Sequence, residues 1–264
     1  MNILTALLAS AAINGFFFFL AARMKTDVFT DITYSLTFAV LAVLGFVFRK
    51  GFHPEQAIVM IFVLLWAARL GSYLFRRILK TGVDHRFDAM RDKPSEFGKF
   101  WALQAVTVWI VMLPALGLYG AESIAAGEFL QRILLVAGSV LWISGFLIEA
   151  VADGQKYAFK NKPENAGKFM NQGLWKHARH PNYFGEILAW WGVALVALPF
   201  LSGWRLLYMA GPVFITVLLL FVSGVPLLEK SWEEKWGGDP AFREYKASTR
   251  LRVPLPKKGG GGGE

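Results

Sequence analysis

The sequence contains no cysteine. This absence excludes disulfide bonds, Cys-ligated metal sites and a thiol nucleophile, although it does not identify the cellular compartment. We assign no metal ligands. Charged residues are also few, at 18% of the chain, whereas hydrophobic residues make up 55%. One soluble domain of this length cannot bury so much apolar surface, so we expect the chain to lie in lipid.

Long uncharged runs recur along the whole chain, so a cleaved signal peptide does not account for them. A helix needs about 20 apolar residues to cross about 30 Å of hydrocarbon. We predict an all-α, seven-transmembrane-helix bundle that forms a single membrane domain over residues 1–258. The predicted spans are about 3–22, 28–48, 57–79, 100–121, 130–151, 183–202 and 205–228. Residues 259–264, five glycines and a glutamate, are interpreted as a flexible tail or an added remnant.

The basic residues predict the orientation of these spans. With the N-terminus outside, 23 of the 28 Lys and Arg residues fall on one side and four on the other, and Arg69 lies within a span. The positive-inside rule then places the large loops and the C-terminus in the cytoplasm, at a bacterial inner membrane or an ER membrane. The net charge of +9 therefore reflects topology, and we expect no nucleic-acid partner.

Two polar stretches, residues 153–181 and 229–256, fall on this same predicted side. Loops of about thirty residues are long for a compact bundle and are commonly functional when they are ordered. Only the last two spans separate the two stretches. We therefore expect a functional site where they meet at the cytoplasmic mouth of the bundle.

Arg69 is a charged residue within the third predicted span. A charge at that depth costs several kcal/mol unless it is paired or faces water. Tyr73 and Arg76 follow at positions four and seven, so the three side chains share one helical face. This face suits an anion. The alternative is one buried ion pair that fixes helix packing, with Arg76 reaching to the membrane interface.

Two acidic groups lie near predicted helix ends. Asp31 opens the second span with Tyr34 one turn later. A carboxyl in an apolar site can keep a proton and polarise a carbonyl, directly or through a phenol. The alternative is a helix cap, with Asp27 serving similarly. Glu149 and Asp153 form a second acidic patch, which contacts ribose hydroxyls or marks the water interface.

The strongest local signal is the run GLWKHARHPNYFGE at residues 173–186. Pro181 suits the first turn of a helix, and Arg179 and His180 stand just before it, where free N–H groups and the helix dipole favour an anion. Asn182, Glu186 and Trp190 continue on one face of this helix. A helix cap with interfacial Arg and His is the alternative, but it does not explain the inward polar residues.

This run resembles the C-terminal signature of membrane steroid 5α-reductases and their bacterial relatives. The segment PLLEK at residues 226–230, followed by Tyr245, Thr249 and Pro254, is similar to the end of the same group. The resemblance covers roughly residues 149–256. It implies a seven-helix fold that binds NADPH at the cytoplasmic mouth, with a lipid-soluble substrate entering from the bilayer. We expect a monomer in contact with membrane lipid.

The resemblance also implies residue roles. The implied reaction is reduction of the C=C bond of a conjugated 3-oxo-Δ4 steroid or similar lipid enone by hydride transfer. In the family, a Glu on the second helix and a Tyr on the third polarise the substrate. Asp31 takes the Glu place, but Trp66 stands where the Tyr is expected, so Tyr34 substitutes or Asp31 acts alone. The residues expected to contact NADPH are Arg69, Tyr73, Asp153, Lys156, Arg179, His180, Asn182, Tyr183, Glu186, Glu229 and Tyr245.

A second family shares this signature. Membrane methyltransferases for isoprenylcysteine and phospholipids also use an Arg-His-Pro-x-Tyr-x-Gly run and bind S-adenosylmethionine, and Glu233 and Glu234 are compatible with that chemistry. Asn182 and Glu186 favour the reductase, as do Arg69 and Tyr73. A basic loop with Lys156, Lys160, Lys162 and Lys168 suits the phosphates of NADPH. A transporter is disfavoured because the polar residues concentrate at one mouth.

Overall fold

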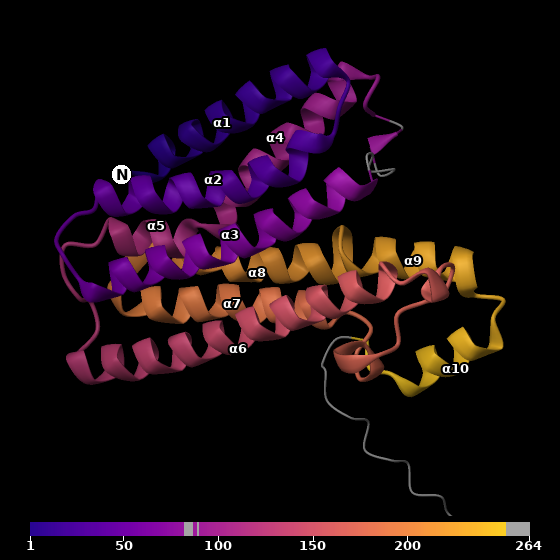
Figure 1. Ribbon diagram of the computed structural model, residues 1–264. Helices are drawn as coiled ribbons and strands as arrows, with labels where there is room; N and C mark the ends of the chain where they lie inside the picture. Colours follow the sequence, from indigo (N-terminus) through magenta and orange to yellow (C-terminus); the bar gives the residue numbers. More distant parts are fainter. Residues whose placement is uncertain (82–86, 89, 252–264) are drawn as a thin grey trace, which may run out of the picture. The chain divides into compact units, whose positions relative to one another are not determined.

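The computed structural model describes residues 1–81, 87–88 and 90–251. Within these residues the chain is helical and contains no strand, apart from one isolated bridge between Ala178 and Arg250. Six helices are long and apolar enough to cross a membrane, or seven if one bent pair counts as a single span. The predicted all-α multi-pass membrane fold is therefore confirmed (Figure 1). Pro254 and the predicted tail 259–264 lie outside the described residues.

The described residues contain ten α-helices. They are α1 (Ile3–Met24), α2 (Val28–Val47), α3 (Pro54–Thr81), α4 (Pro94–Val111), α5 (Leu113–Tyr119), α6 (Glu128–Lys160), α7 (Pro181–Ala197), α8 (Ala210–Val217), α9 (Val225–Trp236) and α10 (Pro240–Ser248). The 3₁₀ segment η5 (Gly203–Met209) precedes α8, and the π-helical turn η6 (Leu218–Val222) follows it.

The fourth predicted span, 100–121, is not one straight helix. It consists of the end of α4 and the short α5, which meet at an angle of 51°. Pro114 has no N–H to donate to the carbonyl of Ile110, and its ring crowds that carbonyl, so the helix breaks at Met112. The sequence prediction counted the apolar residues correctly and overlooked this proline.

Of the two stretches predicted as polar loops, the first begins on a helix and the second is largely helical. Helix α6 continues to Lys160, so Asp153, Lys156 and Lys160 lie on a helix rather than in a loop. The C-terminal stretch forms α9 and α10. Polar residues such as Lys, Gln and Glu have high helix propensity, so a run that leaves the hydrocarbon need not stop being a helix. Helix α6 ends only where Pro163 follows.

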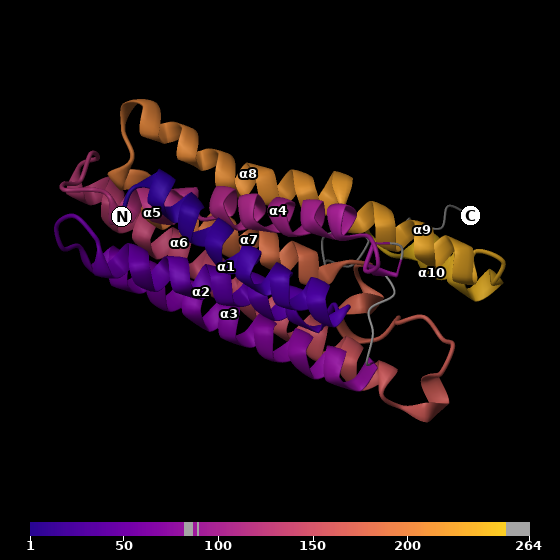
Figure 2. The same cartoon turned by 90° about the horizontal axis from the view of Figure 1, so that it is seen from above.

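The described chain divides into two compact units, and the prediction of a single domain stays a prediction. Unit 1 comprises Met1–Val140 and Trp190–Phe214. Within it α1 packs on α2 and α4, and α2 packs on α3, as both ribbon views show (Figures 1 and 2). The apolar side chains of α1 that face away from these contacts, such as Leu8 and Phe19, are exposed, as expected for a surface that meets lipid.

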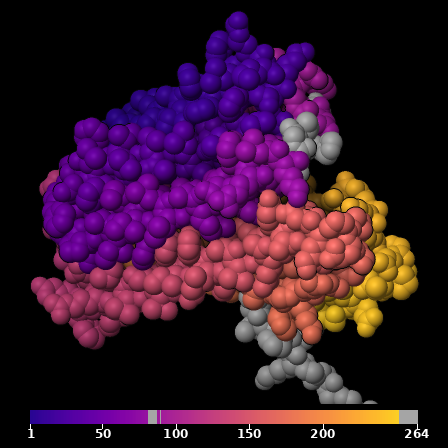
Figure 3. Space-filling model, viewed as in Figure 1, coloured from indigo at the N-terminus to yellow at the C-terminus, as the bar shows by residue number. Residues whose placement is uncertain are grey.

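Amide and hydroxyl side chains tie the helices of unit 1 together. Asn14 of α1 donates to Thr37 Oγ1 of α2 at 3.2 Å and accepts from Gln104 Nε2 of α4 at 2.9 Å. Both amides are almost fully buried. In a membrane such bonds between helices replace the hydrophobic driving force that lipid cannot supply. These bonds join buried side chains and lie beneath the outer surface of α1 to α3, which Figure 3 draws in indigo to purple.

Unit 2 comprises Leu141–Ala189 and the chain from Ile215 onward. Here glycines bring α6 and α7 into close contact, because a Cβ at Gly145 would lie 2.5 Å from Gly185 O and from Ala189 N. A Cβ at Gly185 would lie 2.6 Å from Gly145 O and from Glu149 N. Small residues permit this approach of helix backbones in membranes. This close contact at Gly145 and Gly185 brings the acidic residues of α6 next to the first turn of α7.

Candidate functional site

A buried polar cluster lies at the start of α7 in unit 2. Arg179 and His180 precede Pro181 and are only 8% and 1% exposed. Glu229 of α9 joins them: its Oε1 accepts from Arg179 Nε at 3.0 Å and lies 2.8 Å from His180 Nε2. Pro181 begins the helix as the sequence predicted, since its missing N–H and fixed φ suit the first turn.

The rest of the Arg179 side chain holds the C-terminal helix. Its Nη1 donates to the carbonyls of Lys246 at 2.8 Å and Thr249 at 3.5 Å. Tyr245 donates its phenolic proton to the carbonyl of Trp175 at 2.6 Å, and burial raises the pKa of this phenol so that it remains a donor. Arg179, Glu229 and Tyr245 therefore stabilise the fold of unit 2, and their predicted contact with a cofactor stays a prediction.

His180 is uncharged at neutral pH. Burial lowers its pKa below the usual 6.5, although the hydrogen bond to Glu229 acts in the opposite direction. The ring is stacked between Trp232, with centroids 5.0 Å apart, and Tyr183, 5.8 Å away. With Glu229 ionised, Nε2 carries the single ring proton and donates it, so Nδ1 is left as an acceptor.

Two buried acceptors in this cluster have no hydrogen-bond partner among the described residues: His180 Nδ1 and Asn182 Oδ1. The amide of Asn182 is oriented by its other end, because Nδ2 donates to Asp153 Oδ1 of α6 at 3.2 Å. Leaving a buried acceptor unpaired costs about 1–3 kcal/mol. A ligand with amide, amine or hydroxyl donors would remove this cost, and NADPH carries all three in its carboxamide, adenine and riboses.

Acidic residues surround Asn182. Asp153 and Glu149 lie one turn apart on α6 and are 5% and 2% exposed. The predicted acidic patch is therefore buried beside α7. Glu186, one turn after Asn182 on α7, is half buried. The close packing of Gly145 on Gly185 brings this part of α6 beside the first turn of α7.

A basic and aromatic pocket lies elsewhere in unit 2. Lys156, Lys160 and Lys168 line it together with Trp232 and Trp236. The ammonium of Lys156 lies 4.6 Å from the ring centroid of Trp175 and 5.8 Å from that of Trp232, which holds this cation over two aromatic faces. Trp232 thus contacts both Lys156 and His180. Sequence reasoning missed Trp232 because nothing in α9 marks which of its faces meets α7.

The predicted catalytic residues lie in unit 1. Asp31 Oδ2 accepts from Arg77 Nη2 at 2.7 Å. Arg76, predicted to share one helical face with Arg69 and Tyr73, is exposed, and Asp31 pairs with the neighbouring Arg77. Asp27 is at the start of α2, yet its side chain makes no capping hydrogen bond and pairs with Arg91 at 3.1 Å. Asp31 sits inside the first turn and is paired rather than capping.

Aromatic residues of unit 1 pack against one another, beginning with Tyr34 one turn after Asp31. The Tyr34 ring centroid lies 5.1 Å from that of Phe38 and 6.4 Å from that of Trp66. Trp66 and Trp190 are 5.1 Å apart, and the indole nitrogen of Trp190 is buried with no partner among the described residues. Arg69 and Tyr73 lie one turn apart on α3 and are half buried.

Comparison with known proteins assigns the chain to a family. A family model described as "Protein of unknown function (DUF1295)" matches residues 17–249. The chain belongs to this DUF1295 family. No solved structure matches it.

The DUF1295 chain is also distantly similar to curated proteins of two kinds. It is 30% identical over 122 residues to "3-oxo-5-alpha-steroid 4-dehydrogenase 1" of Bos taurus, covering 46% of this chain and 44% of that protein. The Homo sapiens protein of that name is 26% identical over 136 residues, 50% of this chain and 46% of that protein.

The second kind is "Probable O-methyltransferase ustE" of Ustilaginoidea virens. It is 35% identical over 77 residues, 29% of this chain and 27% of that protein. This DUF1295 chain thus spans less than half the length of each of these relatives. The similarities suggest an enzyme and leave its reaction open between two chemistries.

Proposed function

We propose that this DUF1295 protein is an NADPH-dependent membrane reductase that acts on the conjugated C=C bond of a 3-oxo-Δ4 steroid or a similar lipid enone. The observation that carries the proposal is the pair of buried acceptors, His180 Nδ1 and Asn182 Oδ1, which lack partners among the described residues. Both stand at the first turn of α7, inside the segment that resembles the reductase signature. Two acceptors buried two residues apart favour a ligand that brings donors to both.

When bound, NADPH supplies a hydride. Asn182, held by Asp153, would orient the cofactor, and His180, held by Glu229, would accept a donor from it. Lys156, Lys160 and Lys168 would neutralise phosphate oxygens. These lysines also favour NADPH over NADH, because the additional 2′-phosphate carries about two negative charges.

Asp31 is the candidate that would polarise the substrate carbonyl, with Tyr34 as a relay. Polarisation lowers the barrier because negative charge develops on this oxygen when the hydride adds to the β-carbon, and a water or a protein acid then protonates the α-carbon to complete the reduction. In the ion pair with Arg77, Asp31 accepts rather than donates. To polarise the substrate carbonyl, Asp31 must therefore exchange its ion pair with Arg77 for a contact with the substrate. The substrate enters from the bilayer, and the orientation we propose has the N-terminus outside and the C-terminus in the cytoplasm.

A titration of the detergent-purified protein tests the cofactor assignment. NADPH should raise the melting temperature in proportion to the logarithm of its concentration. Asn182→Ala should weaken NADPH binding by about tenfold or more, because it removes an acceptor worth about 1–3 kcal/mol. Asn171→Ala is the matched control, since Asn171 is exposed in the same unit. Equal affinities for the two variants would remove Asn182 from the site.

A methyltransferase is the second candidate, favoured by the similarity to the probable O-methyltransferase. Of the two acidic residues that suit this chemistry, Glu233 is paired with Lys246, and Glu234 lies 4.0 Å from Lys230. The same titration separates the candidates. A rise in melting temperature with S-adenosylmethionine and none with NADPH would replace the reductase by the methyltransferase.

A further inference from the structure

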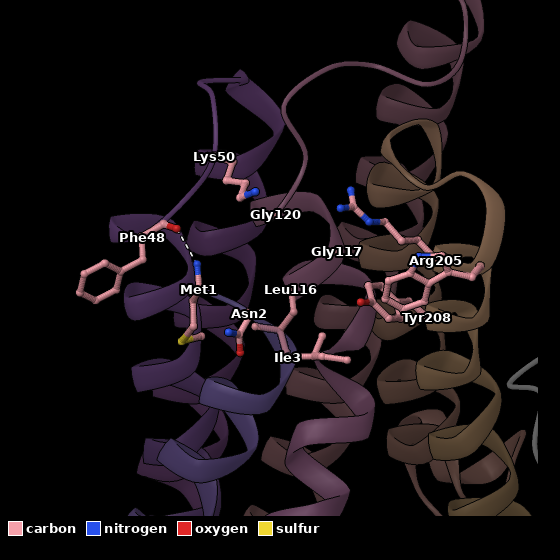
Figure 4. Close-up of a pocket in the computed structure, with 11 residues that line it drawn as sticks. Met1, Asn2, Ile3, Phe48, Lys50, Leu116, Gly117, Gly120, Arg205 and Tyr208 are labelled. Atoms are coloured by element: carbon pink, nitrogen blue, oxygen red, sulfur yellow. Dashed lines mark hydrogen bonds between the residues drawn. The ribbon is translucent and has the colours of Figure 1, made fainter.

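A pocket of about 410 Å³ lies in unit 1, lined entirely by residues of that unit. Four separate segments form it: the residues before α1, the connection after α2, the end of α5, and η5 (Figure 4). Met1 N donates to the carbonyl of Phe48, which holds two of these segments together. The pocket is thus a structured junction of chain segments rather than a gap under one loop.

Two cationic side chains line this pocket, Lys50 and Arg205, in addition to the N-terminal amine of Met1. The sequence places four Lys and Arg residues near this end of the predicted spans, namely Arg49, Lys50, Arg132 and Arg205. Two of the four therefore converge on one cavity. Lys50 bonds to Glu122 at 3.0 Å on the exposed side, whereas the Arg205 guanidinium has no hydrogen bond or ion pair among the described residues. An acceptor with negative charge is the missing complement.

The remaining walls are apolar or aromatic. Ile3 and Leu116 contribute apolar surface, and Trp204 and Tyr208 contribute rings with a polar edge, whereas the ring of Phe48 points away from the other lining residues (Figure 4). Tyr208 reaches the cavity because position 117 is a glycine: a Cβ there would lie 2.6 Å from the Tyr208 ring. Trp and Tyr side chains with basic residues at the ends of membrane helices are typical of the lipid–water interface.

We propose that this pocket binds the phosphate of an anionic phospholipid, with Arg205 and Lys50 on the phosphate oxygens and the apolar wall along the start of an acyl chain. The charge of the pocket calls for an anion, and its position at helix ends with an apolar wall calls for an amphiphile. Free phosphate has the negative charge but lacks the acyl chain. A phospholipid satisfies both the cationic and the apolar surface of the pocket.

The test measures the melting temperature of the detergent-purified full chain against phosphatidylglycerol added to the micelles, with phosphatidylcholine and inorganic phosphate as separate arms. Phosphatidylglycerol should stabilise the protein most, inorganic phosphate should leave it unchanged, and the double variant Lys50→Gln/Arg205→Gln should need about tenfold more phosphatidylglycerol for the same shift. Arg132→Gln is the matched control, because Arg132 is exposed near the same end and does not line the pocket.

Several outcomes would overturn the proposal. They are an unchanged requirement for phosphatidylglycerol in the double variant, an equal loss in Arg132→Gln, or equal protection by inorganic phosphate. Native mass spectrometry gives a second readout if the double variant melts at a lower temperature without lipid. Wild-type protein should retain one phosphatidylglycerol molecule, and Arg205→Gln should release it.

Discussion

At the scale of single residues, pairing decides what the charged side chains of this protein do. Arg179 and His180 were predicted from their place before Pro181, and they do lie at the start of α7. Their partner Glu229 is about fifty positions away along the chain, 50 for Arg179 and 49 for His180. Local sequence patterns carry no information on such distant pairing, so the sequence did not predict that Arg179 and His180 pair with Glu229.

His180 makes stability depend on pH. Its pKa in the folded state lies below the usual 6.5 because the ring is buried. The unfolded chain therefore takes up a proton at a pH where the native ring does not, and the free energy of unfolding should fall as the pH drops below about 6.5. Melting temperatures between pH 5 and 8 would show this. His180→Gln should flatten the profile, whereas His177→Gln should leave it in place. Parallel profiles for wild type and His180→Gln would contradict this account of His180.

At the scale of helices, the sequence predicted seven spans, and the described residues hold six candidate spans or seven with the bent pair, because length and hydropathy decide whether a segment can cross a membrane. It failed at helix ends. The break at Pro114 and the extension of α6 to Lys160 depend on single residues and on helix propensity rather than on hydropathy. The contact between α6 and α7 was also unforeseen, since one glycine on each helix, Gly145 and Gly185, permits it only when the other is opposite.

Substitutions at two glycines of α6 should separate the effect of helix packing on stability from the effect of helix propensity. Gly145→Ala should lower the free energy of unfolding by about 1–3 kcal/mol, because its Cβ would overlap the α7 backbone. It should also weaken NADPH binding, since Asn182 would move from Asp153. Gly154→Ala, on the same helix with open space around its Cβ, should instead raise the free energy by about 0.5–1 kcal/mol. Denaturation in detergent measures both, and a destabilised Gly154→Ala would refute this reading of α6.

At the scale of the whole molecule, composition alone identified a multi-pass membrane protein, because no soluble core could hide its apolar surface. The DUF1295 family assignment and the two kinds of distant relative leave its chemistry to be settled by the site itself. The buried acceptors at the start of α7 are what the proposed reductase requires and what a purely structural helix cap does not explain. Whether a nicotinamide nucleotide reacts in this protein therefore decides its function.

The most direct measurement is the fate of a label. Purified protein in lipid nanodiscs would be incubated with a 3-oxo-Δ4 steroid and NADPH deuterated at the reactive carbon of its nicotinamide. The product should carry one deuterium by mass spectrometry with wild-type protein, and its yield should fall at least tenfold with Asn182→Ala. A reduced product without deuterium, or transfer of a labelled methyl group from S-adenosylmethionine to a lipid with no reduction of the enone, would contradict the central claim.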